Sequence, residues 1–482
     1  MQTGIFTRIS LYIRYAVSSL LILLVSCAVN PVTGQNELML VSERQELQIG
    51  KDAAPSATWD FGGHYHDSAL ESYLGAIVKR LWKISERAHL PVEFHILNTS
   101  VPNAFALPGY VAITRGLLSE MENEAQFAAV MGHEIGHVMA RHTAQRLSRM
   151  QLQQIGLAIG AASLGGSSGG DTFLKVGAMG SSLLLLNYSR SQEIQSDRLG
   201  VKYMSRLGYD PHEAISAHEV LQASANNYLK RLGKSRSEDS FMSNLLSTHP
   251  REEVRISEIQ GMINQLPPFN IKGDGKFSTT FLNATKKMRK TNKVYFKYDK
   301  AQTYYQEKKF TKAEELLLEA INQNDHQAAF YSLLGFIKLQ QKNYGDAKKA
   351  YSESLSIDTQ YQPSIYGMGL FHFFEKNYIM AVNEFNNSLK YYPKHAQSHF
   401  GLGSSYFKLK EYSKAIPYLN NFAQAVPRHP EVHGYLGICF DNRREIRPAV
   451  ISYRNQLAVA PDTELGRHAQ KRLEYLEPYL KK

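Results

Sequence analysis

The chain is poor in cysteine and has no long uninterrupted apolar run. Its two cysteines, Cys27 and Cys439, are too few for a disulfide framework. The apolar stretches at 15–27 and within 151–186 are short for a membrane span, and glycines and Asp171 interrupt the second. The formal net charge is +11, but no nucleic-acid-binding signature accompanies it, so the excess of basic residues is typical of solvated helix faces. We therefore expect no nucleic-acid partner.

The N-terminus has the pattern of an export signal. Arg8 and Arg14 precede "YAVSSLLILLVSC", an apolar stretch of secretory-signal length. Residues 24–27, "LVSC", resemble a bacterial lipobox, in which the cysteine is lipid-modified and becomes the first mature residue. The absence of aspartate after Cys27 fits, by resemblance, sorting to the outer membrane. We expect a signal peptide at residues 1–26 and a periplasmic protein lipid-anchored through Cys27; an uncleaved signal anchor is the alternative.

Periodicity predicts a mostly helical region with a small sheet. Apolar residues at three-and-four spacing predict a helix within 68–86. The alternating "VEFHILN" at 92–98 predicts a strand, and "AFALPGYVAIT" at 104–114 is a second extended run broken by Pro108 and Gly109. Two strands joined by a turn are expected there, followed by a helix that opens near "ENEAQFAAVM" with acidic residues in its first turn.

That helix carries the motif HExxH. His133 and His137 are four residues apart, so they lie one above the other and can present two imidazoles to one ion. Glu134 can then act as the general base on a water molecule. A catalytic zinc site needs a third protein ligand and leaves a fourth position for water. His142 follows His137 by five residues without a glycine turn, so we interpret it as a solvent-side histidine.

A better third ligand lies in "NYSRSQEIQSDRLGVKYM", residues 187–204. Glu193 and Asp197 share one helix face, so Glu193 can bind the metal while Asp197 orients the imidazole of a ligand histidine. A pair of exposed carboxylates is the alternative reading.

The C-terminal third repeats with a period of 34 residues. Large apolar residues, alanines three positions later, glycines and prolines all keep this period, which is the tetratricopeptide (TPR) pattern. We place five units at 294–463 and a capping helix at 464–482, and expect a curved array with a partner-binding surface rather than a mere spacer. The large residues are Phe310, Tyr344, Tyr378, Tyr412 and Ile446; the glycines are Gly335, Gly369, Gly403 and Gly437.

With these motifs together, the chain resembles the BepA-type periplasmic metalloproteases, gluzincins related to HtpX and to CAAX prenyl proteases and joined to TPR repeats. "SRSQEIQSD" matches the family's "SRxxExxAD" except that Ser196 replaces the alanine. The resemblance covers nearly all of the mature chain. It implies one zinc ion per chain, bound by His133, His137 and Glu193, with Glu134 as the catalytic base.

Two further segments resemble this family. "NAFALPG" is similar to an edge strand that pairs with extended substrate, although Gly109 is followed by Tyr110 where most relatives have a second glycine. "STHPREEVRI" is similar to the element "THPxxxxRI", which implies that His249 is a resting-state metal ligand or an oxyanion group. Arg255 is then placed behind the ligands together with Asp197. A helix-capping or core role is the alternative for His249 and for Arg255. The substrate strand comprises Asn103, Ala104, Phe105 and Ala106.

We therefore predict an α+β, predominantly helical zincin domain followed by an α-solenoid of TPR repeats. The resemblance implies a zinc endopeptidase that degrades misassembled outer-membrane proteins in envelope quality control, with unfolded clients and the barrel-assembly machinery as partners through the TPR surface. One alternative is a TPR chaperone or scaffold for outer-membrane protein assembly. Another is an HtpX-like integral-membrane protease, which would differ at 151–186, a segment we interpret as a lid or plug. The predicted domains are a lipoprotein signal peptide (1–26), a tether (27–50), a gluzincin domain (51–263), a linker (264–293), five TPR units (294–463) and a capping helix (464–482).

Overall fold

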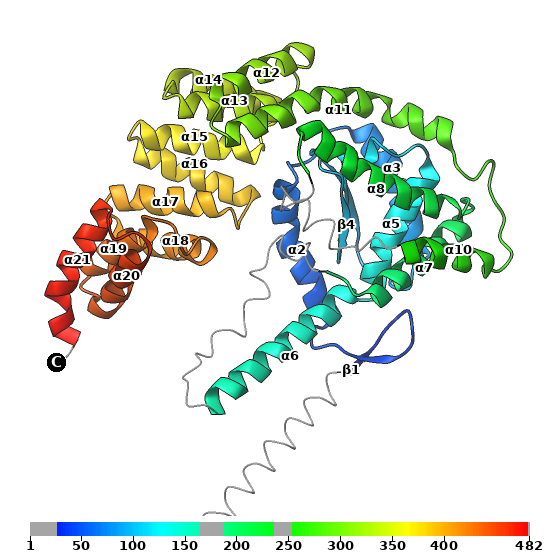
Figure 1. The fold of residues 1–482 in the computed structure, drawn as a ribbon, viewed down its shortest axis with the longest axis horizontal. Coiled ribbons are helices and arrows are strands. Elements are labelled where there is room, and N and C mark those ends of the chain that lie inside the picture. The colour runs from blue at the N-terminus through cyan, green and yellow to red at the C-terminus, as the bar shows by residue number, and fades with distance from the viewer. Residues whose placement is uncertain (1–26, 164–186, 236–252, 481–482) are drawn as a thin grey trace, which may run out of the picture. The chain divides into compact units, whose positions relative to one another are not determined.

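The computed structural model describes residues 27–163, 187–235 and 253–480 (Figure 1). The chain divides into two compact units, Met1–Lys293 and Val294–Lys482. Within the described ranges, no helix combines the length and apolar character needed to cross a membrane.

The first described residues of the first unit, from Cys27 onward, pack against its helices. Strand β1 (Cys27–Val29) pairs antiparallel with β2 (Asn36–Leu38), and α2 (Glu43–Asp60) begins with a capping box at Ser42. The Leu40 backbone nitrogen donates to Ser148 Oγ at 2.8 Å. The segment predicted as a tether and a helix start, residues 27–50, buries Met39 and Val41 and bonds to a distant helix.

A three-stranded sheet lies beside the long helices of the first unit. The strands are β3 (Glu93–Leu97), β4 (Ala104–Leu107) and β5 (Tyr110–Thr114), in the order β3-β5-β4. Strand β3 runs parallel to β5 and β4 runs antiparallel, with Leu107 opposite Tyr110. Gly109 adopts φ +88° between the two antiparallel strands, a conformation that glycine adopts without steric cost. The two predicted extended runs form three strands rather than two: 92–98 contains β3, and 104–114 divides at Pro108 and Gly109 into β4 and β5. Strand β4 forms one edge of the sheet.

Two of the long helices begin at side-chain caps and pack directly on each other. Asn123 caps α5 (Glu124–Met139), and Ser189 forms a capping box at the start of α7 (Arg190–Leu207). Helix α3 (Ser68–Lys83), predicted from its apolar spacing, buries its apolar face in the same core as β5 and α5. The remaining helices are α4 (Arg115–Leu118), α6 (His142–Ser163), α8 (Glu213–Leu232) and α10 (Glu253–Asn264).

The predicted linker at 264–293 is helical over its second half. Helix α11 (Ser278–Gln306) begins inside it, and Phe281 and Met288 are fully buried in the core of the first unit. The guanidinium of Arg289 donates to the backbone carbonyl oxygens of Ser119 and Met121. Buried side chains and bonded backbone therefore limit the irregular connection to residues 265–277, where proline and glycine are concentrated.

The second unit is an array of antiparallel helix pairs (Figure 1). The large residues of the 34-residue period are the first residues of the second helices. Tyr351 packs against glycines of two successive repeats: a Cβ atom would lie 2.4 Å from its ring at Gly335 and 2.3 Å at Gly367. Residues 464–480 form the expected final helix as α21 (Glu464–Leu476) and η4 (Glu477–Leu480). The other helices are α12 (Phe310–Gln323), α13 (Ala328–Gln340), α14 (Tyr344–Ile357), α15 (Gln362–Phe374), α16 (Tyr378–Tyr391), α17 (Ala396–Lys408), α18 (Tyr412–Ala425), α19 (Val432–Asn442) and α20 (Ile446–Val459).

Candidate active site

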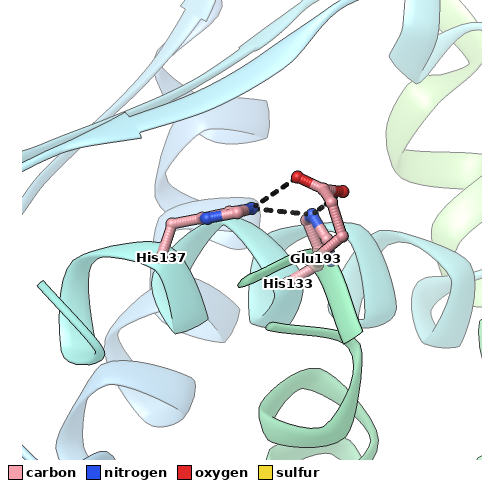
Figure 2. A group of neighbouring side chains, drawn as sticks. All are labelled: His133, His137 and Glu193. Carbon is pink, nitrogen blue, oxygen red and sulfur yellow. Dashed lines mark hydrogen bonds and ion pairs between the residues drawn. The ribbon is translucent and has the colours of Figure 1, made fainter. Parts of the chain in front are cut away.

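Two histidines of α5 and one glutamate of α7 point toward a common centre (Figure 2). The Nε2 atoms of His133 and His137 are 3.1 Å apart. Glu193 places Oε1 3.4 Å from His137 Nε2 and Oε2 3.6 Å from His133 Nε2. The structure thus brings together the three residues expected to bind zinc, although Glu193 lies 56 positions after His137.

Small residues let the two helices approach closely enough for this convergence. A Cβ atom at Gly132 would lie 3.0 Å from the Cα atom of Gly200, and one at Gly136 would lie 3.1 Å from the Cα atom of Ser196. Ser196 itself is fully buried, so only a small side chain fits there. The departure from the family's alanine therefore keeps the helix spacing.

The donor set fits a zinc ion. Two ligands 2.0–2.1 Å from a tetrahedral ion are about 3.3 Å apart, close to the three separations that His133, His137 and Glu193 show. Two imidazole nitrogens and one carboxylate oxygen are ordinary zinc ligands. Burial lowers the pKa of His137 well below its usual value, which favours the neutral imidazole that a metal requires.

Asp197 holds the imidazole of His133 from behind. Its Oδ1 lies 2.8 Å from His133 Nδ1, which leaves His133 Nε2 facing the centre. Burial alone would raise the pKa of Asp197, but its hydrogen bonds with His133, His218 and Arg255 outweigh burial and keep this pKa well below its usual range. Asp197 is therefore an ionised carboxylate that accepts a hydrogen bond from His133 Nδ1.

Arg255 joins the two carboxylates of α7. Its guanidinium donates to both oxygens of Asp197, at 2.7 and 2.8 Å, and lies 2.7 Å from Glu193 Oε2. Burial lowers the pKa of Arg255, but the two carboxylates more than compensate and raise it. The buried cation balances part of the negative charge that α7 brings to the centre.

His142 is fully buried beside His137, so its interpretation as a solvent-side histidine is wrong. Its Nδ1 lies 2.8 Å from His137 Nδ1, and its Nε2 lies 2.8 Å from Gln195 Oε1. Burial lowers the pKa of His142 to about 4. The reason for the error is that α6 begins at His142 itself, which turns the side chain back under α5.

A pocket opens beside the centre. It is lined by His133 and Glu134 of α5, by His218 of α8, and by Asn103 and Ala104 at the start of β4. The pocket therefore reaches from the candidate base to the sheet edge. The side chains of Ala104, Phe105 and Ala106 of the predicted substrate strand are all buried in the two apolar cores.

Residues 68–263 match the family model of peptidase family M48. These residues form an M48 peptidase domain. Residues 328–361 and 380–430 match two models of the tetratricopeptide repeat. The chain therefore combines an M48 domain with C-terminal TPR repeats.

Curated relatives cover about half of the chain. The mitochondrial metalloendopeptidase OMA1 of Schizosaccharomyces pombe is 29% identical over 235 residues, which are 48% of this chain and 64% of the yeast protein. The beta-barrel assembly-enhancing protease of Yersinia pestis is 26% identical over 301 residues, 57% of this chain and 60% of that protein. The Escherichia coli protein of the same name is 27% identical over 261 residues, 51% and 50% of the two chains. This chain thus spans between half and two thirds of the length of these relatives.

Among solved structures, Pseudomonas aeruginosa PilF aligns with 38% of this chain and 86% of its own, at 18% identity and a TM-score of 0.36.

Parts of the predicted site lie outside the described residues. His249 falls in 236–252, and most of the predicted lid or plug falls in 164–186. Cys27 is described only through its backbone, as the first residue of β1. The roles expected for His249, for the lid and for lipidation of Cys27 therefore stay predictions.

The M48 domain also holds residues that the sequence analysis missed. His218 Nε2 lies 3.4 Å from Asp197 Oδ1, and burial lowers the pKa of His218. Tyr188 stacks on His137 with ring centroids 3.9 Å apart and planes at 22°. No spacing rule connects these residues to HExxH. The sequence offered only a weak signal for them: His218 lies on a helix of the same domain, and Tyr188 lies just before the helix that carries Glu193.

Proposed function

We propose that this chain is a zinc-dependent endopeptidase of the bacterial cell envelope that degrades misassembled outer-membrane proteins. The observation that carries the proposal is the convergence of His133, His137 and Glu193, next to a pocket that His133 and Glu134 line. The names of the relatives from Yersinia pestis and Escherichia coli support the envelope setting. Lipid anchoring at Cys27 and a zinc stoichiometry of one belong to this proposal.

Different residues at the site carry out different parts of peptide-bond hydrolysis. A zinc ion held by the three ligands would act as a Lewis acid toward water and the scissile carbonyl. Glu134 follows His133 on the same helix and lines the pocket, where it accepts a proton from the attacking water and returns it to the nitrogen of the leaving amine. Glu134 is 7% exposed, which limits the hydration of its carboxylate.

The start of β4 provides a place for extended substrate. Strand β4 pairs with β5 on one side, and no strand among the described residues pairs with its other side. Asn103 and Ala104 line the pocket together with Glu134. A substrate strand added along β4 would bring its backbone to the candidate base through main-chain hydrogen bonds, which are independent of sequence. We propose that the TPR repeats bind the client or the assembly machinery.

The test uses Glu134→Gln in the full-length chain, with the exposed Glu353→Gln as the matched control. Cleavage of a labelled, unfolded β-barrel protein should fall about 10²–10⁴-fold in Glu134→Gln and stay unchanged in Glu353→Gln, because only Glu134 transfers the proton. Zinc content should be the same in both. Unchanged cleavage by Glu134→Gln would refute the mechanism. If instead cleavage is lost while the variant still supports outer-membrane protein assembly in cells, the TPR scaffold rather than proteolysis provides the essential activity.

A further inference from the structure

We propose that His142 is a positioning residue that fixes the tautomer of His137 and thereby makes its Nε2 available to the metal. This inference rests on the proposed zinc function, and it concerns residues to which neither the motif nor the resemblance gives a role. Its basis is a chain of three side chains, Gln195, His142 and His137, joined by two hydrogen bonds of 2.8 Å.

The direction of each hydrogen bond follows from the first. Gln195 presents its carbonyl oxygen, Oε1, to His142 Nε2, so Nε2 must carry the proton and donate. In a neutral imidazole the other nitrogen is then bare. His142 Nδ1 is therefore an acceptor, and His137 Nδ1 must donate to it. The remaining nitrogen, His137 Nε2, carries no proton and faces the centre.

With the hydrogen bonds reversed, His137 Nε2 could not bind a metal. If the Gln195 amide donated to His142 Nε2, each tautomer along the chain would invert, and His137 Nε2 would carry a proton. The same inversion follows if a protonated His142 donated through Nδ1. Only one orientation of the Gln195 amide is therefore compatible with His137 as a ligand.

The surroundings keep His142 in this role. Its side chain is fully buried, which disfavours the charged imidazolium. The hydroxyl of Ser196 lies 3.5 Å from His142 Nδ1, farther than His137 Nδ1 at 2.8 Å, so His137 is the closer donor. The ring of Tyr188 stacks on the ring of His137 and restricts its plane.

The two ligand histidines thus have different partners behind them. His133 bonds to a carboxylate, Asp197, whereas His137 bonds to a neutral imidazole. A carboxylate enforces the tautomer by its charge, but a neutral histidine does so only while its own far nitrogen is bonded. Gln195 is the last of the three hydrogen-bonded side chains, so it acts on the metal site without contacting the ligand His137.

The experiment measures zinc affinity of the full-length chain by competition with a chromophoric chelator. His142→Leu removes the acceptor and should weaken zinc binding about 10–100-fold, the usual effect of losing a partner behind a metal ligand. His142→Asn keeps an acceptor oxygen at the position of Nδ1 and should stay within a few-fold of wild type. Gln195→Met frees the far nitrogen and should cause a smaller loss, whereas the matched Gln260→Met, on the surface of α10, should cause none.

The outcomes separate this inference from the function on which it rests. If the unmodified chain binds no zinc, the proposed function fails. If it binds zinc but His142→Leu binds within twofold of wild type, or His142→Asn is as weak as His142→Leu, the positioning role is refuted. Thermal unfolding of each variant shows whether a loss of affinity accompanies a loss of fold. Nitrogen-15 chemical shifts of His137 in the metal-free chain should show a protonated Nδ1 and a bare Nε2 in wild type and in His142→Asn.

Discussion

Gly200→Ala should weaken metal binding more than it weakens the fold. The added Cβ atom would lie 3.0 Å from the His133 backbone nitrogen and 3.3 Å from the carbonyl carbon of Gly132. Optimal carbon contacts are 3.5–4.0 Å, and backbone atoms cannot rotate away, so α5 and α7 must separate by about 0.5 Å. Zinc sites tolerate deviations of about 0.2 Å in ligand distance, so Glu193 would move out of range of the histidines.

The expected stability change is small because two effects oppose each other. Overpacking costs about 1–3 kcal/mol, while replacing glycine by alanine inside a helix returns about 1 kcal/mol. The net loss in the free energy of unfolding should therefore be about 0–2 kcal/mol. Zinc affinity, in contrast, should fall about tenfold or more.

The matched control is Gly261→Ala in α10, where a Cβ atom meets nothing within 4 Å. This variant should gain up to about 1 kcal/mol of stability and keep its zinc affinity. Chelator competition gives the affinity and denaturant unfolding gives the stability. Wild-type zinc affinity in Gly200→Ala would show that the close contact of the two helices does not set the ligand distances.

Three further predictions address other parts of the chain. Asp197→Asn should lower zinc affinity about 10–100-fold in chelator competition, because the carboxylate behind His133 is lost; equal affinity would contradict its orienting role. Burial lowers the pKa of His395 to about 4, so its neutral form contributes stability above pH 6.5, and this contribution, at most about 3 kcal/mol, is lost as the pH falls through 4. His395→Asn should therefore reduce the difference in unfolding free energy between pH 7 and pH 4. An unchanged difference would show that His395 does not contribute to the pH dependence of stability. Gly367→Ala should destabilise the repeats by about 1–3 kcal/mol in thermal unfolding, because Tyr351 occupies the space, whereas Gly345→Ala, with nothing within 4 Å, should not.

The sequence predicted those features that depend on local spacing. HExxH identifies two ligands because a helix repeats every 3.6 residues, and the 34-residue period identifies the repeats because each unit has the same contacts. Glu193 could be predicted because its helix carries a motif of its own, "SRSQEIQSD". The small sheet followed from alternation and from Pro108 and Gly109.

The features that sequence reasoning missed depend on contacts between distant segments. His142 was misplaced because its burial results from the start of a new helix, which no residue near it signals. His218 reaches Asp197 from α8, and the packing that brings α8 there involves no short-range pattern. Residues 27–50 lack strong periodicity, and they pack onto the domain through the buried side chains of Met39 and Val41 and through bonds to distant residues such as the one from Leu40 to Ser148.

The aromatic residues wedged between successive repeats determine how the array can deform. Phe385, like Tyr351, fits against glycines of two neighbouring first helices, Gly369 and Gly401. Bending the solenoid at such a junction would pull the ring out of one of its two slots and expose apolar surface to water. The array is therefore stiff at these junctions, and a protein client of the kind proposed above would have to adapt its own shape to the repeats.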